Sequence, residues 1–381
     1  MNDKKYIRRS FGEIPAISLF TLGTMRAIGS SEEMYEVIKA ACFAGINHIE
    51  TSPAYGNAES FIGIALKKLR QENIEPQNDW VITSKILPGI TVSEGKEQIR
   101  RILSQLGRRK IENLAIHGLN LPIHLDWVVH GEGKDLFNWA IKENLIKQIG
   151  FSSHGSSTLI ENAIESNLFK FCSLHLHLLD QERIPLAKLA LKKRMGVMAI
   201  SPADKGGRLY DPSQTLLDIC HPITPLELAY RFLIAQKIST LTLGAKQPKD
   251  LFHAKRLINA NGPLNDSEIS SINRLQTEGK YRLGSTMCGQ CKECLPCPKN
   301  IPINEILRLR NLAVGYDLKT FAKERYNLIG RADHWWETVN ASACESCGDC
   351  LPRCPNQLNI PELLKETHSL LIDKPRRRLW D

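Results

Sequence analysis

The chain alternates short apolar runs with longer amphipathic segments from residue 15 to about residue 260. The runs are rich in β-branched residues and are short enough to be buried strands, whereas the segments between them carry helix-start signals. The predicted strands are residues 17–24, 47–51, 80–86, 113–119, 146–152, 170–178, 197–202 and 239–245. The helix starts are capping patterns at Ser30 with Glu33, Thr91 with Glu94, and Thr224 with Glu227.

Eight strand and helix units within about 250 residues predict a (β/α)8 TIM barrel. A doubly wound open sheet is the alternative arrangement for such a pattern. We place the barrel in residues 1–280. In a barrel, functional side chains gather at the C-terminal ends of the strands, so polar residues that close a strand are the candidates for chemistry.

Composition narrows the class of protein. The 381 residues are 42% hydrophobic, which is enough for one large core and a small second unit. No apolar run reaches the roughly 18 to 20 residues of a membrane span, so we expect no span and a cytoplasmic protein. Arg8 and Arg9 could be read as a twin-arginine export signal, but the segment after them is too polar for one.

Cysteines are distributed unevenly. Cys42, Cys172 and Cys220 are scattered in apolar surroundings, where a buried thiol acts as a small hydrophobe. The other eight form the motifs C-x2-C-x2-C-x2-C-P and C-x2-C-x2-C-x3-C-P, at Cys288, Cys291, Cys294, Cys297, Cys344, Cys347, Cys350 and Cys354. In a cytosolic chain such clusters indicate metal ligation rather than disulfides.

The cysteine spacing suits iron–sulfur clusters. Three closely spaced thiolates can hold three corners of a cubane, while the cysteine before proline ligates the other cluster. By analogy with bacterial ferredoxins, two [4Fe-4S] clusters are expected, one on Cys288, Cys291, Cys294 and Cys354, the other on Cys344, Cys347, Cys350 and Cys297. Zinc is the alternative metal, although zinc ribbons favour separated C-x2-C pairs. The shorter gap in the first motif leaves a single cluster as a further alternative.

Residues 281–381 resemble a small, mostly α-helical, ferredoxin-like dicluster domain. The segments between the two cysteine motifs, including residues 332–340, have helical character. Such a domain is found fused to one branch of the family that the barrel region resembles.

That resemblance is carried by residues at the predicted strand ends. Glu50 and Tyr55 lie in "ETSPAYG", Lys85 ends the third strand and His117 the fourth. These positions, with "LGTM", "IGFSSH" and "SPADKGG", resemble the aldo/keto reductase family, whose motif reads D-T-A-x-x-Y-G. The resemblance implies that Tyr55 donates a proton, Lys85 is its electrostatic partner, His117 orients a carbonyl, and Glu50 replaces the usual aspartate.

These residue types suit carbonyl reduction. The pKa of a free phenol is about 10, so we expect the Lys85 ammonium to lower the pKa of Tyr55 and ease proton transfer. Glu50 has one more methylene than aspartate, and we expect it still to pair with Lys85. Neutral His117 can donate a hydrogen bond to the carbonyl oxygen.

The resemblance also implies NADPH as cofactor. There is no G-x-G-x-x-G after a predicted strand, so a Rossmann domain is not indicated. The implied cofactor residues are Ser152, Ser153, Ser173, Ser201, Gly244, Lys246 and Lys249. His253 and Ala254 stand where the family has Glu-Asn, which leaves NADH as an alternative. The alternative role for Ser152 and Ser153 is to cap a helix that begins at Ser156.

We therefore predict an oxidoreductase that reduces a small-molecule aldehyde or ketone. The clusters would stabilise the fold, sense oxygen or exchange electrons with a redox partner protein. The rival interpretation is an electron-transfer protein with a scaffold barrel and an acidic partner near "KPRRRLWD", residues 374–381 of a chain with net charge +9. Nucleic-acid binding is not expected, because the basic tail has no interleaved aromatic residues beyond Trp380.

Overall fold

The computed structural model describes residues 6–76, 79–331 and 339–374. The chain divides into two compact units. The first contains the residues up to Gly206 together with Ala229–Leu264, and the second contains Gly207–Leu228 together with the residues from Asn265 onward. Each unit is described below by itself.

The first unit is a closed barrel of eight parallel strands. The strands, in order around the barrel from β3 to β10, are β3 (Phe20–Gly23), β4 (His48–Glu50), β5 (Val81–Ile86), β6 (Ile111–His117), β7 (Ile146–Ser153), β8 (Phe171–His175), β9 (Gly196–Ile200) and β10 (Thr240–Gly244). β10 pairs with β3 in parallel and closes the ring. The predicted TIM barrel is confirmed, and the open doubly wound alternative is wrong.

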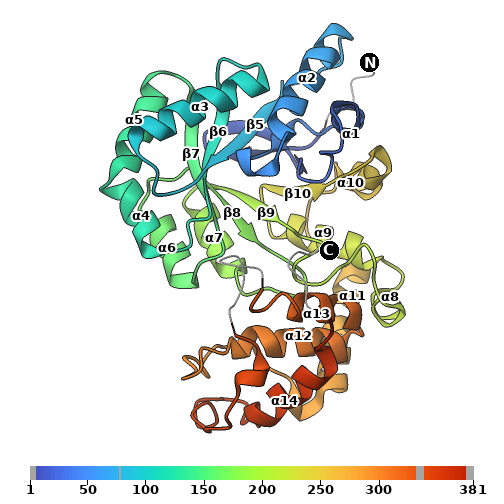
Figure 1. The fold of residues 1–381 in the computed structure, drawn as a ribbon. Helices are drawn as coiled ribbons and strands as arrows, with labels where there is room; N and C mark the ends of the chain where they lie inside the picture. The colour runs from blue at the N-terminus through green and yellow to red at the C-terminus, as the bar shows by residue number, and fades with distance from the viewer. Residues whose placement is uncertain (1–5, 77–78, 332–338, 375–381) are drawn as a thin grey trace. The chain divides into compact units, whose positions relative to one another are not determined.

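Helices follow the strands and lie outside the barrel (Figure 1). They are α1 (Ser31–Phe43), α2 (Ala58–Gln71), α3 (Val92–Leu106), α4 (Pro122–Val129), α5 (Glu132–Lys142), α6 (Ser157–Glu165), α7 (Ile184–Lys192), α9 (Pro225–Ala235) and α10 (Phe252–Leu257). Thr91 and Glu94 form the predicted capping box at α3, and Ser30 caps α1. These caps fix where the connections leave the strand ends.

An N-terminal hairpin closes the amino end of the barrel. β1 (Arg8–Phe11) pairs with β2 (Ile14–Ser18) in antiparallel register, and Phe11 lies in the barrel core with Phe171 and Met198. Sequence patterning did not predict β1. Arg8 and Arg9, considered above as an export signal, donate to backbone carbonyls of the barrel, including that of Gly45 at 2.7 Å.

A layer of polar side chains crosses the barrel interior above the hairpin. His48 contacts Thr21 through Nδ1 and Thr83 through Nε2, both at 2.7 Å. Asn113 donates to Thr83 at 2.9 Å and accepts from Gln148 at 2.7 Å. Burial lowers the pKa of His48 to about 3. This histidine is therefore neutral and belongs to the core.

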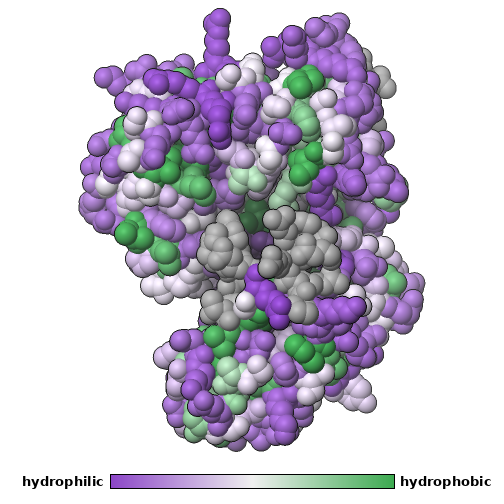
Figure 2. Space-filling view, in the orientation of Figure 1, coloured by the Kyte–Doolittle hydropathy of each residue, from purple (hydrophilic) through white to green (hydrophobic). Residues whose placement is uncertain are grey.

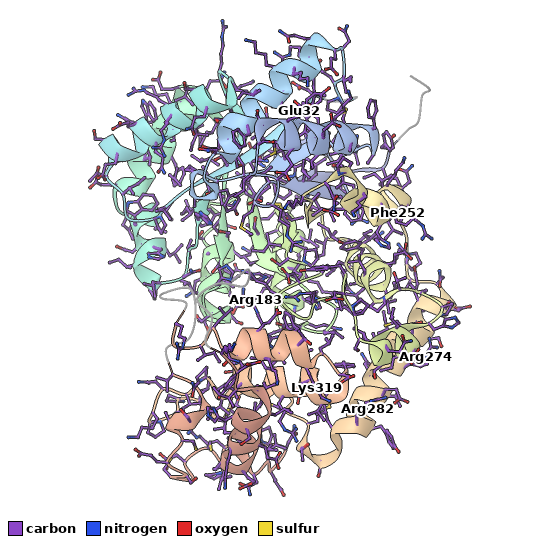
Figure 3. The ribbon with its side chains drawn as sticks, turned by 45° about the vertical axis from the view of Figure 1, so that its right-hand side comes forward. Glu32, Arg183, Phe252, Arg274, Arg282 and Lys319 are labelled. Carbon is purple, nitrogen blue, oxygen red and sulfur yellow. The ribbon has the colours of Figure 1, made fainter. Side chains whose placement is uncertain are left out.

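The second unit is helical. Its elements are α8 (Gln214–Cys220), α11 (Asp266–Leu283), η3 (Gly284–Thr286), α12 (Ile303–Gly315), α13 (Lys319–Tyr326), η5 (Ala341–Ala343) and α14 (Ile360–Leu371). Arg274 on α11, labelled in Figure 3, donates to the carbonyl of Ile219 at 3.0 Å and so ties α11 to the end of α8. The expected boundary between residues 280 and 281 falls within α11.

Hydrophilic residues cover most of the face seen in Figure 2, and apolar residues form small separate groups on it. Among the described residues, no helix combines the length and the apolar character needed to cross a bilayer.

Candidate active site

Three neighbouring strands and one turn bring the four predicted catalytic residues together. Glu50 ends β4, Lys85 lies near the end of β5 and His117 ends β6. Tyr55 closes a single 3-10 turn, η1 (Pro53–Tyr55), that begins directly after β4. Because the strands are parallel, all four lie at the C-terminal mouth of the barrel.

Lys85 is the centre of the group. Its Nζ donates to Glu50 Oε1 in a direct contact, to the carbonyl of Thr51 at 2.9 Å and to the Tyr55 hydroxyl at 3.0 Å. The side chains of Lys85 and Glu50 are only 3% and 6% exposed. Burial lowers the pKa of Lys85, but three acceptors match the three N–H groups of an ammonium, and Glu50 opposes the shift. The pair therefore holds the charged form.

Tyr55 differs from expectation in its acidity. Burial raises the pKa of Tyr55 to about 12, whereas the sequence analysis expected Lys85 to lower it. Desolvation penalises the phenolate more than the ammonium stabilises it. The hydroxyl donates to Glu50 Oε1 at 3.4 Å. Tyr55 is thus a protonated phenol throughout the neutral range.

His117 lies beside Tyr55, with ring centroids 6.0 Å apart and planes at 88°. Burial lowers the pKa of His117 to about 3, and Lys85 and Lys205 shift it in the same direction. The imidazole is therefore neutral. Its Nδ1 lies 3.1 Å from the hydroxyl of Ser52, a residue that the sequence analysis did not single out.

The serines predicted to contact a cofactor have different environments. The Ser152 hydroxyl accepts from the Gly118 N–H at 3.1 Å, and the Ser153 hydroxyl donates to the Leu119 carbonyl at 2.6 Å. Both therefore hold the loop after β6. They do not cap α6, which Ser156 caps itself. Ser173 is 1% exposed, and its hydroxyl has no hydrogen-bond partner in the described part of the chain.

The remaining predicted cofactor residues lie after β9 and β10. Ser201 directly follows β9 and has a left-handed φ of 50°. Gly244 ends β10, and a Cβ there would lie 3.2 Å from the Arg26 side chain. Lys246 and Lys249 are exposed on either side of Pro248, the first residue of η2 (Pro248–Leu251). In the barrel, one strand, β3, lies between β10, which precedes these lysines, and β4, which carries Glu50.

Basic side chains that the sequence analysis missed lie after β7, β8 and β9. Lys205 Nζ is 3.3 Å from His175 Nε2, and the rings of His175 and His154 are 4.5 Å apart. Arg183, labelled in Figure 3, donates to the carbonyls of Ser153 at 3.0 Å and His154 at 3.2 Å. His154 directly follows β7 and His175 ends β8, so strand-end position was the available signal for these two histidines, whereas Arg183 and Lys205 lie farther along their loops.

The two cysteine loops of the second unit repeat the same backbone. Each follows a 3-10 turn, η3 or η5, and leads into a helix, α12 or α14. The repeated left-handed positions are Gln290 and Ser346 (φ 61° and 56°), Lys292 and Gly348 (67° and 85°), and Asn300 and Gln357 (55° and 52°). Asn311 on α12 holds the first loop by donating to the Cys288 carbonyl at 2.8 Å. The two cysteine loops therefore share the same pattern of left-handed residues and the same order of elements.

The cysteines approach one another across the two loops. Cys297, Cys344, Cys347 and Cys350 line one cavity. Cys288 interacts electrostatically with Cys291 and Cys354, and Cys294 with Cys288, Cys291 and Cys350. Burial, reinforced by these neighbouring thiols, raises the pKa of Cys294 to about 11.

None of the eleven cysteines, all of which lie within the described residues, forms a disulfide. Within residues 6–76, 79–331 and 339–374, no three or more His, Cys, Asp or Glu side chains converge on the position of a single metal ion. The thiols of an iron–sulfur cubane bind separate iron atoms, and cysteine thiolates are the donors that such a cluster takes.

Residues 332–338 and 375–381 lie outside the described residues. They include most of residues 332–340, the second of the two segments predicted to be helical between the cysteine motifs, and most of "KPRRRLWD".

Comparison with known proteins agrees with the barrel geometry. Residues 20–277 match the model of the aldo/keto reductase family. A curated aldo-keto reductase from Mycolicibacterium vanbaalenii is 26% identical over 240 residues, which are 58% of this chain and 79% of that protein.

Solved structures share the fold. An aldo-keto reductase from Bombyx mori in complex with NADP has a TM-score of 0.57 at 18% identity, covering 71% of this chain and 92% of that one. The aldose reductase from Schistosoma japonicum has a TM-score of 0.56 at 21% identity, covering 70% and 91%. Because the family model spans more than half of the sequence, the chain belongs to the aldo/keto reductase family, a family of oxidoreductases.

Proposed function

We propose that the barrel reduces an aldehyde or ketone with NADPH, using Tyr55, Lys85, His117 and Glu50. The observation that supports this most directly is the buried Lys85 ammonium, whose three donors meet Glu50, the Thr51 carbonyl and the Tyr55 hydroxyl. This arrangement places a protonated phenol beside a fixed positive charge at the mouth of the barrel.

The residues divide the work as follows. NADPH, when bound, supplies the hydride that adds to the carbonyl carbon. His117 donates a hydrogen bond to the carbonyl oxygen and orients it. Tyr55 gives its proton to that oxygen as negative charge develops, and the Lys85 ammonium, 3.0 Å from the phenol oxygen, stabilises the phenolate that remains. Glu50 keeps Lys85 charged, so the glutamate fulfils the role expected of an aspartate.

The cofactor assignment rests on donors rather than on a visible motif. The buried Ser173 hydroxyl is a polar group that a bound amide could satisfy. Lys246 and Lys249 supply positive charge next to the turn that Pro248 begins, and this suits a phosphate. The Bombyx mori aldo-keto reductase, whose fold this chain shares, forms a complex with NADP.

For the second unit we propose two [4Fe-4S] clusters, with the ligand sets stated above. The electrostatic neighbours of Cys288 include Cys354 from the other loop, and those of Cys350 include Cys297. These crossed neighbours are the ones that a dicluster arrangement requires. The clusters would supply one-electron chemistry, and no step of the carbonyl reduction above is routed through them.

NADPH consumption by anaerobically purified protein, measured against a panel of aldehydes and ketones, tests the barrel proposal. Tyr55→Phe removes the proton donor, and we expect its rate to fall about 1,000-fold with NADPH binding unchanged. A wild-type protein that binds NADPH but matches Tyr55→Phe across the panel would contradict the proposed reaction.

A further inference from the structure

The hydroxyl of Ser52 connects the turn that carries Tyr55 to the ring of His117. Ser52 is 1% exposed and precedes η1 as its N-cap residue. Its Oγ accepts from the Ala54 N–H at 3.2 Å and lies 3.1 Å from His117 Nδ1. One buried oxygen thus contacts both the Tyr55 turn and the imidazole.

The direction of the second hydrogen bond follows from the donors and acceptors at Ser52. A hydroxyl has one hydrogen to donate and two lone pairs. The Ala54 N–H occupies one lone pair, and His117 Nδ1 is the one acceptor that the described residues offer to the hydroxyl hydrogen. If Nδ1 carried the proton instead, the Ser52 hydrogen would be buried without a partner, which is costly.

We propose that Ser52 is a positioning residue that fixes the tautomer of His117, donating to Nδ1 so that the ring proton is on Nε2. This inference rests on the proposed function, because the Nε2–H group is the donor that the carbonyl oxygen requires. The imidazole is neutral, so only the choice of tautomer decides whether His117 donates or accepts. The same hydroxyl fixes the start of η1 and couples the placement of Tyr55 to the orientation of His117.

The test begins with the free protein and does not depend on turnover. We would label histidines with ¹⁵N, assign His117 by comparison with His117→Asn, and read which ring nitrogen is protonated. We expect an unprotonated Nδ1 and a protonated Nε2 in the wild type and in Ser52→Thr, and a mixture of tautomers in Ser52→Ala. A wild-type His117 protonated on Nδ1, or Ser52→Ala shifts identical to wild type, would overturn the proposal.

Kinetics provide the second readout. Ser52→Ala should lower kcat about tenfold with KM unchanged, the loss expected for one hydrogen bond of this type, and Ser52→Thr should restore the rate. Ser30→Ala is the matched control. Ser30 also caps a helix of the barrel, by accepting from the Glu33 N–H at 3.1 Å, but it precedes α1 rather than the turn that carries Tyr55. If Ser30→Ala and Ser52→Ala lose kcat equally, Ser52 is only a cap. If wild type shows the expected tautomer but no NADPH turnover, the reaction fails and the tautomer assignment stands.

Discussion

The mouth of the barrel and the cysteine loops hold their polar groups in different ways. In the barrel, side chains at or just after the strand ends satisfy one another and the nearby backbone, as Lys85 does with the Glu50 carboxylate, the Thr51 carbonyl and the Tyr55 hydroxyl. In the second unit, the backbone sets the shape, through left-handed residues repeated at equivalent positions such as Gln290 and Ser346. We therefore expect the barrel site to be sensitive to the loss of a charge and the loops to be sensitive to the loss of a cysteine or of a backbone conformation.

Removing the central charge of the barrel should have the largest effect. Lys85→Met leaves the Glu50 carboxylate buried without its partner, and we expect a loss of about 3–5 kcal/mol in the free energy of unfolding together with all carbonyl turnover. Urea denaturation measures the stability change. Lys170→Met is the control, because its pair with Glu13 is 47% and 49% exposed and should contribute about 0–1 kcal/mol. Equal losses in the two variants would show that burial does not distinguish the pairs.

Removing one of the eight clustered cysteines should halve the number of iron atoms bound per chain and leave the barrel folded. Anaerobically purified protein should contain about eight iron atoms per chain, and Cys344→Ser about four. Cys42→Ser, at a buried thiol on α1, is the control and should keep all its iron. Zinc instead of iron in elemental analysis would contradict the cluster assignment. A simultaneous loss of aldehyde turnover in Cys344→Ser would show that the two regions are not independent.

Acid should destabilise the barrel through His48. Its pKa is lowered to about 3 in the folded chain and is about 6.5 when unfolded, so the unfolded state binds the proton first. His48 alone therefore lowers the free energy of unfolding by about 1.4 kcal/mol for each pH unit below 6.5, down to about pH 3. The measurement is urea denaturation from pH 7 to pH 5 for wild type and His48→Gln. The variant should be less stable at pH 7 and should lose less on acidification, and parallel curves would contradict this.

The smallest expected effects have opposite signs within one cysteine loop. Gly348 has φ 85° and Ser346 has φ 56°. Gly348→Ala should destabilise the second unit by about 1–2 kcal/mol, because an L side chain is strained at positive φ. Ser346→Gly should stabilise it by up to about 1 kcal/mol. Thermal unfolding of the metal-loaded protein measures both changes, and a shift of the same sign in the two variants would refute backbone control of the loop.

Sequence patterning predicted the barrel strands because they are buried on both faces and appear as continuous apolar runs. The cysteine spacing predicts two sets of four thiols, and this assignment stays a prediction. The hairpin strand β1 was missed because it contains Arg8 and Arg9, and their role as donors to distant backbone carbonyls is not visible in a local pattern.

The sequence also did not predict the direction of the Tyr55 pKa shift or the hydrogen bond between Ser52 and His117. Tyr55 was expected to be acidified by Lys85, but burial reverses the sign of the shift. Ser52 was overlooked because its partner His117 is 65 residues away. Strand-end position identifies which residues meet, but the depth of burial and the geometry of one hydroxyl decide how they behave.

The hairpin that carries Phe11 has a kinetic consequence. Phe11 and Phe171, with ring centroids 4.9 Å apart, fill the interior at the amino end of the barrel. A molecule that reaches Tyr55 must therefore arrive and depart through the same opening. Under the proposed function, the alcohol would therefore leave by the passage through which the carbonyl compound entered, so release of one molecule would precede entry of the next.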